Sequence, residues 1–147
     1  MPHDDRAGPW LWILGFLGVA NLANAGWMLA DPAGWYAGLP AAVPDTGPLN
    51  THFVRDIGSA FAVVGVALLW GALRPALRVP LLALAALFYL LHGLVHVADT
   101  LADRLPAAHW AIDLPGVYLP AILLLVLTAA AVRSARRTTG ASLSGRI

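Results

Sequence analysis

The chain has no cysteine, which excludes disulfide bonds, thiolate metal sites and a cysteine nucleophile. It is also poor in charge: 12% of its 147 residues are Asp, Glu, Lys or Arg, about half the share of an ordinary soluble domain. Its formal net charge is only +1, which gives no electrostatic reason to expect a nucleic acid partner. Hydrophobic residues make up 59% of the chain, so the composition predicts an integral membrane protein whose surroundings are a lipid bilayer.

Four segments have about the 20 apolar residues that a helix needs to cross a bilayer. They cover residues 10–29, 52–73, 79–101 and 114–132. The first segment is expected to be retained, because the residues before it lack the positive charge typical of a signal peptide. We therefore predict an all-α, four-transmembrane-helix bundle that occupies residues 1–133 as a single domain. Residues 134–147 are rich in Ser, Thr, Gly and Arg and are expected to form a flexible cytoplasmic tail.

Arginine placement predicts the orientation of the bundle, because short cytoplasmic connections are enriched in Lys and Arg. Arginines follow the second and fourth segments, as Arg74, Arg78, Arg133, Arg136, Arg137 and Arg146. Both termini should therefore be cytoplasmic in a bacterial inner membrane, with residues 30–51 facing outward. Four prolines in that stretch argue against a regular helix, and Trp35, Tyr36 and Leu39 favour a long, ordered outer loop that lies on the bundle.

Short polar and small side chains indicate how the helices begin and pack. Asn50 or Thr51 is a good N-cap for the second helix, because its side chain can accept a hydrogen bond from a free backbone N–H. Asn21 and Asn24 share one face of the first helix and need partners inside the bundle. Small residues in the second helix predict close approach to a neighbour, namely Gly58, Ser59, Ala60, Ala62 and Gly65.

Ionisable side chains interrupt two of the apolar segments. On a helix, His92, His96 and Asp99 fall within roughly 60° of one another and share one stripe. His52 and Asp56 repeat the i, i+4 spacing of the two histidines near the start of another helix. Because charged and ionisable groups are costly in a membrane, such residues mark a functional site by default.

Counting 1.5 Å per residue from the cytoplasmic ends predicts which of these side chains are level. Asp56 and His96 both lie roughly 26 Å from that side, and His52 and Asp99 both lie roughly 30 Å from it. The count predicts that His96 faces Asp56 and that Asp99 faces His52, near the extracytoplasmic face of the membrane. His92 would be the deepest member of the cluster.

Imidazole and carboxylate ligands at i, i+4 on facing helices are typical of metal sites in helix bundles. The main hypothesis is therefore a site for zinc, iron, manganese or copper, with a possible redox role, and haem is less favoured because His92 and His96 share one helix. The predicted ligands are His52, Asp56, His92, His96 and Asp99. Residues expected to surround them as orienting or pocket groups are Arg55, Asn21, Asn24, Tyr89, Tyr118 and Asp113.

Two other functions fit the same residues. The polar groups could handle protons or hold a small lipid-soluble ligand without any metal, with Asn21 and Asn24 lining the pocket. Alternatively, they could be structural pairs in an accessory subunit of a larger membrane complex or in a homo-oligomer. Whether the protein is a membrane metalloenzyme, an oxidoreductase or no enzyme stays open at this point.

Residues 46–58, with the sequence TGPLNTHFVRDIG, and the spaced residues His92-x-x-x-His96-x-x-Asp99 carry a family resemblance. They resemble a group of small, uncharacterised bacterial four-helix membrane proteins whose layout is similar to that of DoxX-like proteins. The resemblance implies a four-helix body and suggests quinone-coupled redox work. Since this chain has no cysteine, the resemblance cannot extend to a thiol-based mechanism.

Overall fold

A computed structural model describes residues 8–144 and is helical throughout its regular elements in that range. Four long helices dominate: α1 (Pro9–Ala30), α3 (Thr51–Leu73), α4 (Arg78–Leu101) and α6 (Leu119–Ser144). The model contains four helices long and apolar enough to cross a membrane, as the four apolar segments predict. The protein is therefore an all-helical, multi-pass membrane protein.

Five short elements connect the long helices. They are α2 (Pro32–Gly38), η2 (Val43–Thr46), η3 (Pro75–Leu77), α5 (His109–Ile112) and the π-helix η4 (Leu114–Tyr118). The prolines of the first connection were expected to exclude a helix there, and α2 corrects that expectation. Pro32 occupies the first turn of α2, where a missing N–H costs little, and Asp31 caps the helix by accepting from the Gly34 N–H at 2.9 Å.

The ends of the long helices follow local sequence signals. Asn50 is the N-cap of α3, and its side-chain oxygen accepts from the Phe53 N–H at 3.1 Å, which confirms the predicted cap. Helix α3 ends before Pro75. At the end of the chain, α6 continues through Ser144, so the described part of the expected tail is helical, and the flexible cytoplasmic tail stays a prediction. Residues 145–147 lie outside the described part of the chain.

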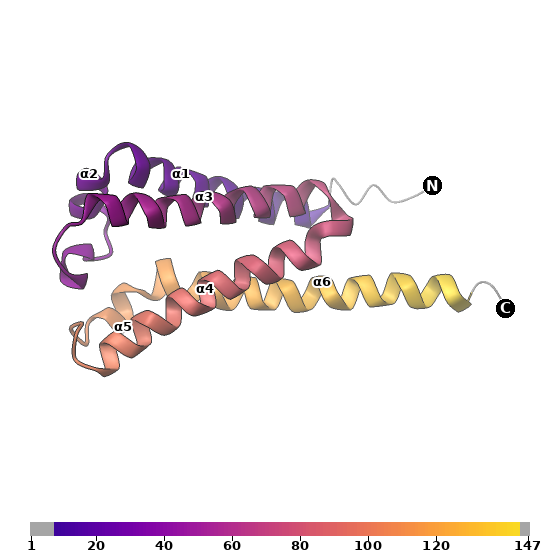
Figure 1. The fold of residues 1–147 in the computed structure, drawn as a ribbon. Helices are drawn as coiled ribbons and strands as arrows, with labels where there is room; N and C mark the ends of the chain where they lie inside the picture. Colours follow the sequence, from indigo (N-terminus) through magenta and orange to yellow (C-terminus); the bar gives the residue numbers. More distant parts are fainter. Residues whose placement is uncertain (1–7, 145–147) are drawn as a thin grey trace.

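The long helices form two hairpin-like pairs (Figure 1). One pair is α1 with α3, the other is α4 with α6, and α3 packs on α4 beside the short turn η3. The pairs meet near η3 and diverge toward the opposite end, which carries α2, η2 and α5 (Figure 1). That opposite end also carries the acidic side chains Asp31, Asp45, Asp56, Asp99, Asp103 and Asp113, and we call it the acidic end. That it faces the cell exterior stays a prediction.

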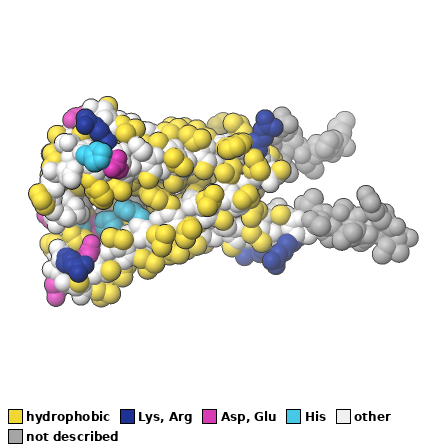
Figure 2. Space-filling model, viewed as in Figure 1, with side chains coloured by type: hydrophobic (Ala, Val, Ile, Leu, Met, Phe, Trp, Pro, Cys, Tyr) yellow, Lys and Arg dark blue, Asp and Glu magenta, His cyan; other side chains and the backbone are white. Residues whose placement is uncertain are grey.

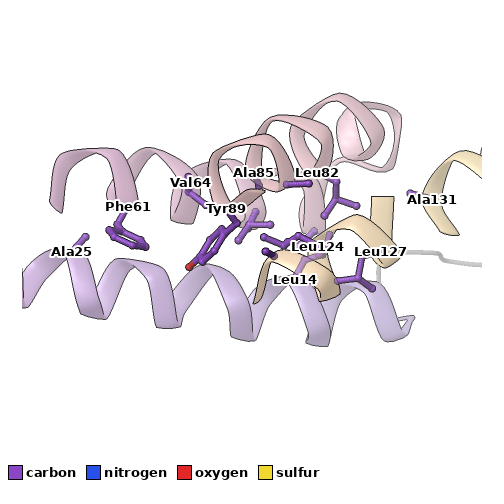
Figure 3. Packing of buried hydrophobic residues seen from close by; sticks show 14 of the residues in the cluster. Leu14, Ala25, Phe61, Val64, Leu82, Ala85, Tyr89, Leu124, Leu127 and Ala131 are labelled. Carbon is purple, nitrogen blue, oxygen red and sulfur yellow. The ribbon is translucent and has the colours of Figure 1, made fainter. Parts of the chain in front are cut away.

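All four long helices contribute to the apolar core (Figure 3). Leu14 of α1, Leu68 of α3, Leu82 of α4 and Leu124 of α6 are almost fully buried. Next to η3, Arg78 is buried. Its guanidinium carbon lies 5.0 Å from the Trp10 ring centre, and its Nε donates to the Gly71 carbonyl at 3.3 Å. The core therefore ties the two pairs together on the side of η3.

Two glycines allow α1 and α3 to touch. A Cβ placed on Gly65 would lie 3.0 Å from the Gly18 carbonyl oxygen, and one on Gly18 would lie 3.0 Å from the Gly65 carbonyl oxygen. Gly58 is similarly close to the Met28 side chain. The predicted close approach is confirmed at Gly58 and Gly65, so α1 and α3 form a closely packed pair.

Candidate functional site

Asp113 lies at the centre of a buried polar cluster at the acidic end. It follows the short helix α5 and precedes the π-helix η4, and its backbone oxygen accepts from the Val117 N–H at 2.8 Å and the Tyr118 N–H at 3.2 Å. Pro120 lacks the N–H that a regular α-helix would donate to the carbonyl of residue 116, which favours the irregular turn. Such π-helical turns occur often at functional sites.

Two histidines bind the Asp113 carboxylate. His96 of α4 places Nδ1 2.8 Å from Oδ2, and His109 of α5 places Nδ1 3.2 Å from both oxygens. The Asp113 side chain is 2% exposed and that of His109 is 0% exposed, while His96 is 17% exposed. The carboxylate therefore joins an imidazole in the protein interior to one that reaches the surface.

His109 also binds a second carboxylate. Its Nε2 lies 3.3 Å from Oδ2 of Asp45, which belongs to the connection between α2 and α3. Asp45 is 44% exposed. A continuous chain of contacts thus leads from water at Asp45 through His109 and Asp113 to His96, and we call these four residues the relay.

A neutral His109 cannot donate to both of its carboxylate neighbours. A neutral imidazole has one N–H donor and one bare nitrogen, and a bare nitrogen facing a carboxylate oxygen is repulsive. Both nitrogens of His109 face carboxylates. Both contacts are favourable only if His109 carries a proton on each nitrogen or if Asp45 or Asp113 is itself protonated. Two hydrogen bonds at His109 therefore require one proton more than a neutral imidazole between two ionised carboxylates carries.

His92 lies on α4 one helical turn before His96, further from the acidic end. Its ring centre lies 4.8 Å from that of His96 and 6.0 Å from that of Phe61 on α3, and its ring is parallel to Phe88 at 6.0 Å. Close by, the Tyr89 hydroxyl donates to Oδ1 of Asn21 at 2.9 Å and joins α4 to α1. Figure 3 shows Tyr89 pointing from α4 toward α1.

The surface is hollowed between the two helix pairs near the acidic end, and histidine side chains lie in this hollow (Figure 2). His96 and His92 are partly exposed, and Phe61 and Phe88 pack against His92. The partly exposed imidazoles therefore lie beside aromatic rings.

The remaining predicted ligands have other partners. His52 and Asp56 contact each other at 3.4 Å on the surface of α3, where their side chains are 87% and 62% exposed. Asp99 binds Arg104 at 2.9 Å. The predicted pairings of His96 with Asp56 and of Asp99 with His52 are therefore wrong.

The surrounding groups also differ from the prediction. Arg55 was expected beside the predicted ligands, and it instead donates from Nε to the Leu29 carbonyl at 3.3 Å. Asn24 accepts from the Trp35 Nε1–H at 2.9 Å and fixes α2 on α1. The Tyr118 ring stacks on the Trp110 ring, with ring centres 6.2 Å apart. Both residues line an apolar groove between α4 and α6. Asp113 is the predicted surrounding residue that contacts the histidines directly, at 2.8 Å from His96, and Asn21 is joined to α4 through Tyr89.

The wrong pairing of His52 and Asp56 with residues of α4 has a physical reason. Counting residues gives the depth of a side chain but not the rotation of its helix. Helix α3 turns Val54, Gly58 and Phe61 inward, so residues 52 and 56 point away from α4. Nowhere in residues 8–144 do three His, Cys, Asp or Glu side chains gather in a way that could hold a metal ion. Metal binding therefore stays a prediction.

Sequence reasoning did not assign Asp45 and His109 to the site. One signal was available for His109, because His109-x-x-x-Asp113 repeats the spacing of His52-x-x-x-Asp56. Between Pro106 and Pro115, however, the segment resembles a loop, and the pattern needs a helical turn to bring the two side chains together. Asp45 lies 64 residues from its partner, and no local pattern marks it.

Comparison with known proteins identifies the family. A family model described as a domain of unknown function, DUF4345, matches residues 10–127. The chain belongs to this family. The matched region contains all four relay residues and both histidines of α4. No curated protein and no solved structure matched the chain. The resemblance to the DoxX-like layout and the bacterial origin stay predictions.

Proposed function

We propose that this member of the DUF4345 family binds a small lipid-soluble molecule in the hollow and exchanges a proton with it through the relay. The observation that carries the proposal is the pair of carboxylates on the two nitrogens of His109, at 3.2 and 3.3 Å. A group that must share an extra proton with its neighbours is suited to passing that proton on.

The direction of the relay supports this function. Asp45 is in contact with water, His109 and Asp113 are sealed from it, and His96 is open to the hollow. His96 uses Nδ1 for Asp113, so its Nε2 is the ring atom left to serve a ligand. A proton taken up at Asp45 can thus reach a bound molecule without an aqueous channel. By the arginine pattern, the relay opens on the extracytoplasmic side.

The surroundings of His92 favour a ligand with an apolar body. Phe61 and Phe88 provide aromatic surface on two helices, and His92 lies between them and His96. A molecule that reaches this place from the bilayer would bury its apolar part against the rings and direct a hydrogen-bonding group toward His96. Burial of apolar area and a single polar contact are the usual composition of a small-molecule site.

Substitution of His96 by alanine should release the bound molecule. We expect about tenfold less of it to remain on the purified protein, since one hydrogen bond to an ionisable group is worth about 1.5 kcal/mol. The measurement is mass spectrometry of organic extracts from the wild-type and His96→Ala proteins in detergent. His52→Ala is the matched control, because His52 is an exposed histidine of the same end. Extracts that contain the same molecules in all three proteins would contradict the proposal.

A metal ion held by His92 and His96 is the second candidate. The observation in its favour is the Nδ1 contact of His96 with Asp113, because a carboxylate often orients a metal-binding imidazole in this way. Two protein ligands would be completed by water or by a bound molecule. Elemental analysis of the same three preparations separates the candidates: stoichiometric zinc, iron, manganese or copper that disappears in His96→Ala would favour the ion.

A further inference from the structure

The connection between α2 and α3 carries Asp45, and we call residues 39–50 of this connection the strap. Its centre is the short helix η2. Ala42, just before η2, has φ of 47°, and Gly47, just after it, has φ of 130°. A left-handed conformation is uncommon for alanine and easy for glycine. The centre of the strap is thus flanked by two points at which the backbone turns sharply.

Hydrogen bonds from α2 and within the strap itself hold the strap in shape. The Tyr36 hydroxyl of α2 donates to the Gly47 carbonyl at 2.7 Å, and the Thr46 hydroxyl donates to the Val43 carbonyl at 2.7 Å. These bonds shape the strap but do not reach the second pair. The contact of Asp45 with His109 crosses to the second pair, at the end where the two pairs diverge (Figure 1).

From this placement we infer that Asp45 is a positioning residue that closes the end of the hollow, and that its release from His109 opens the relay to water. The inference rests on the proposed function, because it names the access route to that same site. Deeper in the bundle, Tyr89 with Asn21 and Phe61 with Phe88 hold the two pairs together independently of the strap. Opening therefore changes the acidic end alone.

The contact of Asp45 with His109 is weak enough to break and re-form repeatedly. Asp45 is half-exposed, so water competes for its carboxylate and weakens its contact with His109. The contacts of His109 with Asp113 are sealed and persist when the strap leaves. His109 would then take the place of Asp45 as the first relay group in contact with water.

Histidine modification by diethyl pyrocarbonate tests the inference on the full-length protein in lipid nanodiscs. Peptide mass spectrometry gives the modification rate of each histidine at one pH. Among the four histidines of the described residues, we expect His52 to react fastest and His109 slowest in the wild type, because their side chains are 87% and 0% exposed. In Asp45→Ala the rate at His109 should rise about fivefold, which corresponds to the loss of a contact of about 1 kcal/mol. The rate at His52 should stay unchanged.

Asp99→Ala is the matched control, because it breaks another ion pair of the acidic end, with Arg104, and leaves the strap untouched. It should not change the rate at His109. Asp45→Asn keeps the size of the side chain and provides a second variant if Asp45→Ala does not fold. An unchanged rate at His109 in the folded Asp45 variant would overturn the inference.

The outcomes separate this inference from the proposed function. If His109 becomes reactive in Asp45→Ala while His96→Ala still retains the same extracted molecules, the strap closes the relay but the ligand proposal fails. If His96→Ala loses a molecule while His109 is equally reactive with and without Asp45, the ligand proposal stands and the strap does not control access.

Discussion

Replacing Asp113 by alanine should lower the free energy of unfolding by about 3 kcal/mol, the cost of removing one member of a buried charged or strongly polar pair. The carboxylate is 2% exposed and serves two imidazoles, His96 at 2.8 Å and His109 at 3.2 Å. Without it, the wholly buried His109 ring loses the partner of its Nδ1, and no water replaces that partner unless the packing opens. Thermal unfolding in detergent, followed by circular dichroism, measures the loss.

The chain contains its own control for this result. Asp56 stands four residues after His52, just as Asp113 stands four residues after His109, but the Asp56 pair is largely exposed. Asp56→Ala should therefore cost less than about 1 kcal/mol. Equal losses for the two variants would mean that burial of Asp113 has no energetic consequence, and the account of the relay would be wrong.

Replacing Gly65 by leucine should lower the free energy of unfolding by about 2 to 3 kcal/mol, in the range of overpacking in a dense interior. A Cβ at this position would lie 2.8 Å from Leu22 Cγ and 3.0 Å from the Gly18 carbonyl oxygen. A backbone oxygen cannot rotate away as a side chain can, so α1 and α3 must separate. Because small residues permit close helix packing in membranes, this contact is a main stabilising feature of the first pair.

Gly15→Leu is the matched control for this substitution. Gly15 lies on α1, and a Cβ placed there would have no neighbour within 4 Å. We expect no loss of stability from it, since leucine is also the better helix former. Unfolding in detergent under identical conditions compares the two variants. If Gly15→Leu destabilises the protein as much as Gly65→Leu, the close contact of α1 with α3 is not the cause.

The sequence predicts the architecture well because each signal acts locally. Apolar length marks the four long helices, and a short polar side chain at Asn50 marks the beginning of α3. The glycines of α3 mark a close contact that the structure places against α1. None of these features requires knowledge of how distant segments are rotated against each other.

The site was harder to predict because it depends on such rotation and on loop contacts. The spacing of His92, His96 and Asp99 correctly places them on one helix face, yet Asp99 turns to Arg104, which follows the end of α4. Depth counting paired His96 with Asp56, whereas the partner is Asp113 at the start of the last membrane segment. The residue type at that partner was predicted correctly, and its position was not.

We propose that the chain of Asp45, His109, Asp113 and His96, whose two middle residues are buried, shares its protons as one unit. Nitrogen-15 NMR of the histidine rings tests it most directly, because ring nitrogen shifts report which nitrogen carries a proton. The protein would be labelled at histidine, placed in nanodiscs and titrated with and without Asp113→Asn. In the wild type, His96 and His109 should change protonation together, and Asp113→Asn should uncouple them while His52 stays unchanged. Independent changes of His96 and His109 in the wild type, unaffected by Asp113→Asn, would contradict the account.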